Sequence, residues 1–327
     1  MVAAISLIQR EWFEHKTGFG WAPIGVLGTL VVITVLALMF ANSAGGVIQV
    51  SFDRDSAGNV TDEINLSLGE YDVVSGDEVL VFQALLSGLF DYTDWSDEEL
   101  SASIDKARTS VALPFQLVYF LVAIFALLGS LHEDRRDRTV LFWKSMPVSD
   151  SQTVLAKLVH IAWVAPMVTI FAILLAEIFL LLIVSVVGEG GIWKLWSNSG
   201  LVMELLELTF GYAIQGLWAL PIYGWLLLVS AAVNRVPFVW AVLVPIVPAV
   251  LETVLFSTSI LREGITNHLR FAALPSAASF GNSGFEPAVH VGGQLELLAT
   301  RDLWIGVAIG TGFVAAAIVM RHRNNEI

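Results

Sequence analysis

Two short motifs in this sequence resemble parts of catalytic signatures, but neither is complete. The run HEDRR at 132–136 begins like the zinc motif HExxH, yet Arg136 stands where the second histidine is required. The run GNSG at 281–284 resembles part of a nucleophile turn, but its second glycine comes one residue early. The six histidines are scattered, and no two have the i, i+4 spacing of a helical metal site. We therefore expect no catalytic residue, no metal site and no enzymatic activity in this chain.

Nucleotides and nucleic acids are also unlikely ligands by composition. The phosphate-binding pattern GxxxxGK[ST] is absent, so we expect this chain to bind no ATP or other cofactor itself. With 30 acidic and 17 basic residues the net charge is −13, which argues against a nucleic-acid partner. The chain has no cysteine, which excludes disulfides, thiolate metal sites and thiol nucleophiles.

One ionisable residue, Glu177, lies within a long apolar run. A charge in the hydrocarbon core costs roughly 2.5–3.5 kcal/mol on insertion scales, so such a residue is a candidate functional group. Two explanations remain open. Glu177 either binds a proton or cation in a transport pathway, or it faces inward and pairs with a polar group from another span. The sequence names no partner for it.

The composition is that of a membrane protein. Hydrophobic residues make up 56% of the 327 residues and charged residues only 14%, against roughly 25% in soluble domains. The apolar runs are close to the roughly 20 residues that a helix needs to span a bilayer. The first run is too long for a typical signal-peptide core of about 7–15 residues, so we prefer a retained span there. The six predicted spans are 21–41, 112–131, 161–187, 208–233, 237–256 and 303–320.

Basic residues predict the orientation of these spans. Ten Lys and Arg residues fall in the leader, the even-numbered loops and the tail, and seven fall on the opposite side. By the positive-inside rule both termini are cytoplasmic, in the cell (inner) membrane. Four prolines inside the predicted spans can kink them, and Gly306 and Gly310 form a GxxxG pattern that permits close helix contact. These prolines are Pro166, Pro221, Pro245 and Pro248.

Two polar regions are predicted on the outer side. The insertion 42–111 contains 14 acidic and three basic residues. Alternating apolar residues around 48–52 and 64–68 predict a β-hairpin, and the pair Ser96 and Glu99 predicts a capping box that opens a helix towards span 2. We expect a small α+β domain whose acidic surface is solvated or captures a cation or partner. The second region, 257–302, suits loops and half-helices that re-enter the outer leaflet.

The loop between spans 2 and 3, 132–152, is the most informative segment. A dense mixed-charge block is followed by large apolar residues, which need a cover in a short cytoplasmic loop. If 139–145 is helical, Val140 and Trp143 share a face that can enter a partner's groove. An aromatic anchor in the lipid headgroups explains the same residues equally well. Ser149 and Gln152 predict a capping box at the start of span 3.

The run EDRRDRTVLFWKSMPVSD, 133–150, resembles the segment after the second span of bacterial ABC-2 type transporter permeases. In that family the segment contributes a coupling helix that docks on a separate ATPase subunit. The leader 1–20 is similar to the family's amphipathic interface helix, with Arg10, Glu11 and Trp12 as its site residues. The resemblance implies these ATPase-coupling residues: Glu133, Arg135, Arg136, Asp137, Arg138, Val140, Phe142, Trp143, Lys144 and Pro147.

The resemblance implies an all-α polytopic exporter subunit with spans 3–6 in 153–327. Two ATPase copies would hold ATP and Mg²⁺, and a second copy of this chain or a homologous permease would complete the pathway in membrane lipid. The transported substrate does not follow from the sequence. The alternative from a different class is an ATP-independent ion-coupled carrier or channel that uses Glu177.

Overall fold

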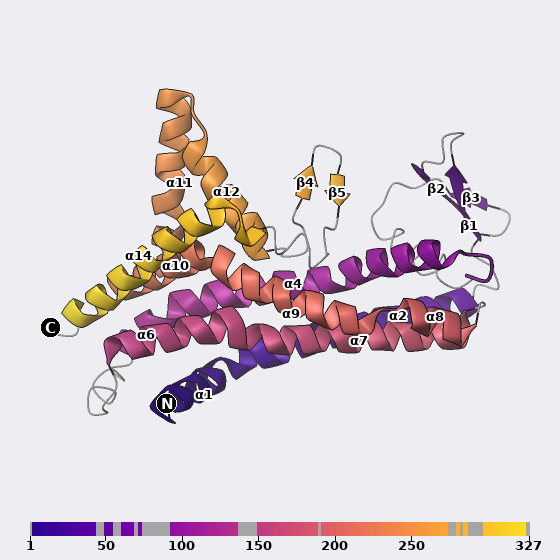
Figure 1. Cartoon of the computed structure of the whole chain (residues 1–327), viewed down its shortest axis with the longest axis horizontal. Helices are drawn as coiled ribbons and strands as arrows, with labels where there is room; N and C mark the ends of the chain where they lie inside the picture. The colour runs from indigo at the N-terminus through magenta and orange to yellow at the C-terminus, as the bar shows by residue number, and fades with distance from the viewer. Residues whose placement is uncertain are drawn as a thin grey trace. The chain divides into compact units, whose positions relative to one another are not determined.

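The computed structural model describes residues 2–43, 49–54, 60–68, 71–73, 92–136, 149–188, 191–273, 279–281, 284–286 and 297–324 (Figure 1). The chain divides into two compact units, which are described separately here. The first comprises Met1–Ile24, Leu113–Ala172 and Val202–Ile327, and the second comprises Gly25–Ala112 and Ile173–Leu201.

Five helical segments are long and apolar enough to cross a membrane, and a bent helix pair makes a sixth if it counts as one span. This agrees with a multi-pass, predominantly helical membrane protein. The five segments are Gln9–Leu38, Asp97–Asp134, Asp150–Val187, Pro237–Phe256 and Arg301–Arg323, and the bent pair is Ile192–Trp218 with Leu220–Ala232.

The leader is helical without a break before the first span. Helix α1 (Val2–Lys16) continues through the π-helical turn η1 (Thr17–Trp21) into α2 (Ala22–Ser43). Gly18 and Gly20 lie within η1 and do not interrupt the helical backbone. Gly18 permits close packing, because a Cβ there would lie 2.7 Å from a methyl group of Val122 on the helix that follows the insertion.

That helix, α4 (Asp97–Arg136), has 40 residues. The predicted capping box is confirmed at its start, since the Ser96 N–H donates to Glu99 at 3.0 Å and the Glu99 N–H donates to the Ser96 hydroxyl at 3.2 Å. As expected, the helix runs on into span 2. Three antiparallel strands precede it: β1 (Gln49–Arg54), β2 (Val60–Leu68) and β3 (Tyr71–Val73), in the order β1-β2-β3. A complete α+β insertion stays a prediction.

The second unit has its own core beside the start of α4. Helix α8 (Ile192–Asn198) contributes Leu195, which packs with residues from α4 and α7 (Ala165–Val187). The Lys194 ammonium donates to the backbone carbonyls of Tyr92, Thr93 and Trp95 and so ties α8 to the segment before α4. The buried members of this core are Tyr92, Leu100, Ile104, Leu181, Val184 and Leu195.

Two predicted spans contain irregular turns near prolines. Span 3 consists of α6 (Asp150–Val159), the π-helical turn η2 (His160–Val164) and α7, which begins just before Pro166. Proline has no N–H for the carbonyl four residues earlier, so a displaced turn at this point has a physical cause. Span 4 is broken into α9 (Leu201–Trp218) and α10 (Leu220–Ala232), bent by 53° next to Pro221. This bend agrees with the expectation that Pro221 can kink span 4.

The last span, α14 (Arg301–Asn324), lies side by side with α10 (Figure 1). A Cβ on Gly310 would lie 2.6 Å from the Leu220 backbone, and one on Gly224 would lie 2.6 Å from the Gly310 carbonyl oxygen. Gly306 faces the ring of His268. The GxxxG pattern thus permits close helix contact, as expected, and the contact it makes lies within one chain.

The region between the last two spans begins with a helical hairpin. Helix α11 (Pro237–Phe256) is followed by α12 (Ile260–Ala273), and the Glu252 carboxylate accepts the backbone N–H groups of Ile260 and Leu261 at 3.0 and 2.9 Å. Glu252 therefore caps α12. Strands β4 (Ser279–Gly281) and β5 (Gly284–Glu286) pair further on. Membrane re-entry of 257–302 stays a prediction.

Candidate functional site

The predicted coupling loop is described only at its two ends. Helix α4 contains Glu133, which is exposed, and ends with Arg135 and Arg136. The capping box is confirmed at the other end, where Ser149 and Gln152 exchange hydrogen bonds at the start of α6. The remaining predicted coupling residues lie outside the described residues: Asp137, Arg138, Val140, Phe142, Trp143, Lys144 and Pro147.

A buried ion pair joins α1 to α6 next to this loop. The Lys157 ammonium donates to the Glu11 carboxylate at 3.2 Å, and both side chains are only 1% exposed. A second carboxylate, Glu14, lies 3.8 Å from the same ammonium. Glu11, a predicted interface residue, is thus buried against α6. Burying a charge is tolerable only when it is paired, and Lys157 provides that pairing.

Asp134, near the end of α4, extends the ion pair into a network. Its carboxylate lies 3.7 Å from Lys157, 3.6 Å from Arg10 and 3.1 Å from Arg321, and its side chain is 8% exposed. Arg10 also bonds Glu14 one helical turn away, at 2.6 Å. Charges from α1, α4, α6 and α14 therefore meet at one place.

Helix α14 contributes Arg321 to these ion pairs. This residue donates to Asp134 and also, at 3.1 Å, to Asp150, the first residue of α6. The exposed His322 ring lies 3.3 Å from the same Asp150 carboxylate. The whole set, here called the buried charge network, comprises Arg10, Glu11, Glu14, Asp134, Asp150, Lys157 and Arg321.

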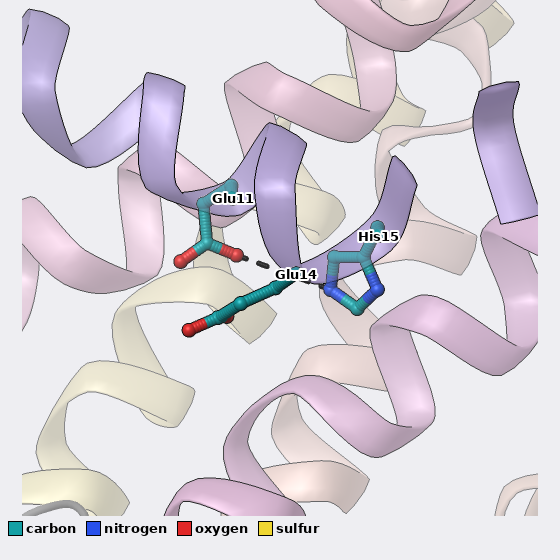
Figure 2. Close-up of side chains that lie close together, drawn as sticks. All are labelled: Glu11, Glu14 and His15. Atoms are coloured by element: carbon teal, nitrogen blue, oxygen red, sulfur yellow. Dashed lines mark ion pairs between the residues drawn. The ribbon is translucent and has the colours of Figure 1, made fainter. Parts of the chain in front are cut away.

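Two members of the network form, together with His15, a group with the spacing of metal ligands. One ligand atom from each of Glu11, Glu14 and His15 lies within 4.8 Å of the others (Figure 2). However, the Lys157 ammonium already lies 3.2 and 3.8 Å from the two carboxylates, where a cation would repel it. The arrangement therefore favours an ion-pair junction between helices over a metal centre.

An aromatic layer adjoins the network where the leader meets the spans. The predicted interface residue Trp12 packs edge-on to His160, with ring centroids 6.2 Å apart. Phe19 contacts the same imidazole at 6.0 Å, so η1 and η2 pack against each other through these two rings. The Tyr119 hydroxyl donates at 2.6 Å to the carbonyl oxygen of Ile161 within η2. These contacts hold both π-helical turns in place.

Glu177 belongs to the second unit. Its side chain is 4% exposed, and its Oε2 atom lies 3.8 Å from the Arg108 Nε atom. Arg108 also donates to Asp105 at 2.9 Å. The geometry fits an inward-facing acid paired with a group from another helix. Arg108 lies within α4, in the part that precedes the apolar span.

Sequence reasoning singled out Arg10 and Glu11 and missed the other five members of the network: Glu14, Asp134, Asp150, Lys157 and Arg321. The bonds from Lys157 to Glu11, from Arg321 to Asp150 and from Arg321 to Asp134 join residues 146, 171 and 187 positions apart, so no local spacing relates them. What the network can do chemically is limited. It holds carboxylates and cations in fixed pairs, an arrangement that suits mechanical connection between helices.

Comparisons of the chain with protein-family models, with curated proteins and with solved structures found no match.

Proposed function

We propose that this chain is the transmembrane permease subunit of an ABC-2 type exporter, moved by separate ATPase subunits through the loop 133–147. The single observation that carries the proposal is the buried charge network. It joins the leader helix to both sides of that loop, through Asp134 at its start and through Lys157 on α6, which follows it. An aromatic anchor in the headgroups would require no such junction.

The proposed mechanism follows from how this junction transmits movement. An ATPase that pulls or pushes on the loop displaces the end of α4 and the start of α6. Because the Glu11, Asp134 and Lys157 charges are buried, separating them would leave an unpaired charge, at a cost of about 3–5 kcal/mol. The three helices therefore move together, and α1 carries the movement into α2 through η1. ATP and Mg²⁺ belong to the partner.

The experiment is co-purification of the affinity-tagged chain from its native membranes, followed by ATP hydrolysis and transport assays in vesicles. We expect a chain with the GxxxxGK[ST] motif to co-purify. Trp143→Ala and Arg138→Glu should each lower ATP-coupled transport at least about tenfold, since roughly 1.4 kcal/mol of lost docking energy gives that factor. Membrane insertion should stay normal. Trp193→Ala is the matched control, because this tryptophan is 85% exposed on α8.

Two results would contradict the proposal. One is full ATP-coupled transport by the Trp143 and Arg138 variants. The other is ATP-independent flux through the chain alone that Glu177→Gln abolishes, which would establish the alternative carrier. Inactivity of the chain alone, with activity restored by the ATPase, would support the exporter.

A further inference from the structure

A single guanidinium group bridges the two ends of the loop 137–148. Arg321 uses Nη1 to donate to Asp134 and Nε to donate to Asp150, both at 3.1 Å. Asp134 lies two residues before the end of α4, and Asp150 is the first residue of α6. The last span of the protein thus contacts the residues that flank the loop on both sides.

The chemistry of this bridge requires arginine. The guanidinium is planar and presents its donors in fixed directions, so two carboxylates bound to different nitrogens have a defined separation. A lysine ammonium is a compact charge on a flexible stem and sets no such angle. Arg321 is only 4% exposed, which limits the rearrangements open to it. The bridge therefore fixes the distance between the two helix ends as well as neutralising their charge.

The rest of α14 packs firmly against α10, so it gives Arg321 a fixed position from which to hold the two loop ends. It packs along α10 with the backbone contact at Gly310 described above, and Arg321 lies three helical turns further along. Its neighbours in the network act differently, because Lys157 and Arg10 connect the loop ends to the leader. Arg321 alone among the described residues connects both loop ends to the last span.

We propose that Arg321 is a positioning residue that sets the spacing of the two ends of the loop 137–148, and that this spacing determines how the loop engages its ATPase. The second part rests on the proposed function. The first part concerns this chain alone. Binding of the ATPase at the loop therefore depends on Arg321, which lies outside the loop.

The spacing can be measured directly, since the chain has no cysteine. Cysteines that replace Glu133 and Leu155, both exposed on the flanking helices, accept spin labels for distance measurement in phosphatidylethanolamine and phosphatidylglycerol vesicles. We expect Arg321→Gln to broaden the distance distribution clearly, and Arg321→Lys to broaden it less. Arg323→Gln, two residues along and exposed, is the matched control and should leave the distribution unchanged.

An unchanged distribution in Arg321→Gln would overturn the positioning role. If that variant does not fold, Asp150→Asn removes one arm of the bridge and leaves the Asp134 arm in place, and it should broaden the distribution as well. An unchanged distribution in Asp150→Asn would then overturn the role.

The second measurement is transport per ATP hydrolysed with the co-purified ATPase. We expect Arg321→Gln to lower this ratio about fivefold or more and Arg321→Lys to recover part of it. A lower ratio supports the link to coupling, whereas an unchanged ratio overturns it. If no ATPase co-purifies, the proposed function fails, and the spin-label distances still decide whether Arg321 spaces the loop ends.

Discussion

Replacing Lys157 by methionine tests the buried charge network most directly. The ammonium is 1% exposed and has Glu11 at 3.2 Å, Asp134 at 3.7 Å and Glu14 at 3.8 Å. Asp134 keeps Arg10 and Arg321 after the substitution, and Glu14 is 39% exposed. The loss therefore falls mainly on Glu11, a buried carboxylate that gives up its ammonium partner. Breaking one side of a buried ion pair costs about 3–5 kcal/mol, and we expect a loss of free energy of unfolding in that range.

The assay is reversible unfolding in mixed micelles with increasing dodecyl sulfate, followed by the fluorescence of the 11 tryptophans. Lys16→Met removes an exposed charge from the end of α1 and is the matched control, with an expected change within about 0.5 kcal/mol. The double variant Glu11→Gln with Lys157→Met removes both charges. It should recover about 1–3 kcal/mol of the loss, because contacting residues couple by amounts of this size.

Two outcomes would refute the reasoning. If Lys157→Met is no less stable than Lys16→Met, the ammonium is not a buried partner of Glu11. If the effects of Glu11→Gln and Lys157→Met simply add, the two groups do not interact, and α1 is not held to α6 by this pair. Either outcome would remove the observation on which the proposed function depends.

Two further predictions concern the spans. Gly310→Ala should lower the free energy of unfolding by about 1–3 kcal/mol, because its Cβ would lie 2.6 Å from the α10 backbone. Gly312→Ala is the control and should be neutral or slightly stabilising, because no atom lies within 4 Å of a Cβ there. Equal effects of the two substitutions in the same unfolding assay would contradict this packing. Arg108→Gln should destabilise the protein more than Glu177→Gln, because Arg108 keeps Asp105 at 2.9 Å when Glu177 is replaced, whereas Glu177 loses its guanidinium when Arg108 is replaced. A larger loss of stability in Glu177→Gln than in Arg108→Gln would show that the ion pair with Arg108 does not account for the burial of Glu177.

The positions of the spans could be predicted because hydropathy and capping are local properties. The helix start at Ser96 and the one at Ser149 follow from two residues three positions apart, and both are confirmed. The partner of Arg108 could not be found in the same way. It pairs with Glu177, which lies on another helix far along the chain, so no local spacing relates the two residues.

The irregularities of the spans were predictable only in part. Proline at 221 indicated a kink, because it removes a backbone donor, but it did not indicate the 53° size of the bend. The GxxxG pattern indicated a close helix contact without naming the partner helix. Small residues permit any backbone to approach, so only the fold identifies α10 as the neighbour of Gly310.

The buried charge network shows which part of a functional site a sequence can indicate. Lys157 lies on the buried face of α6 with Val154 and Leu158, and Glu11 lies one turn from the buried Leu7 on α1. A charge on the apolar face of an amphipathic helix must be buried, and a buried charge must be paired, so this pattern predicts a partner of opposite sign for each residue. Lys157 and Glu11 have opposite signs and belong to helices at the same predicted membrane side. That reasoning could have proposed the pair, whereas the three-way position of Asp134 depends on helix packing that no local spacing encodes.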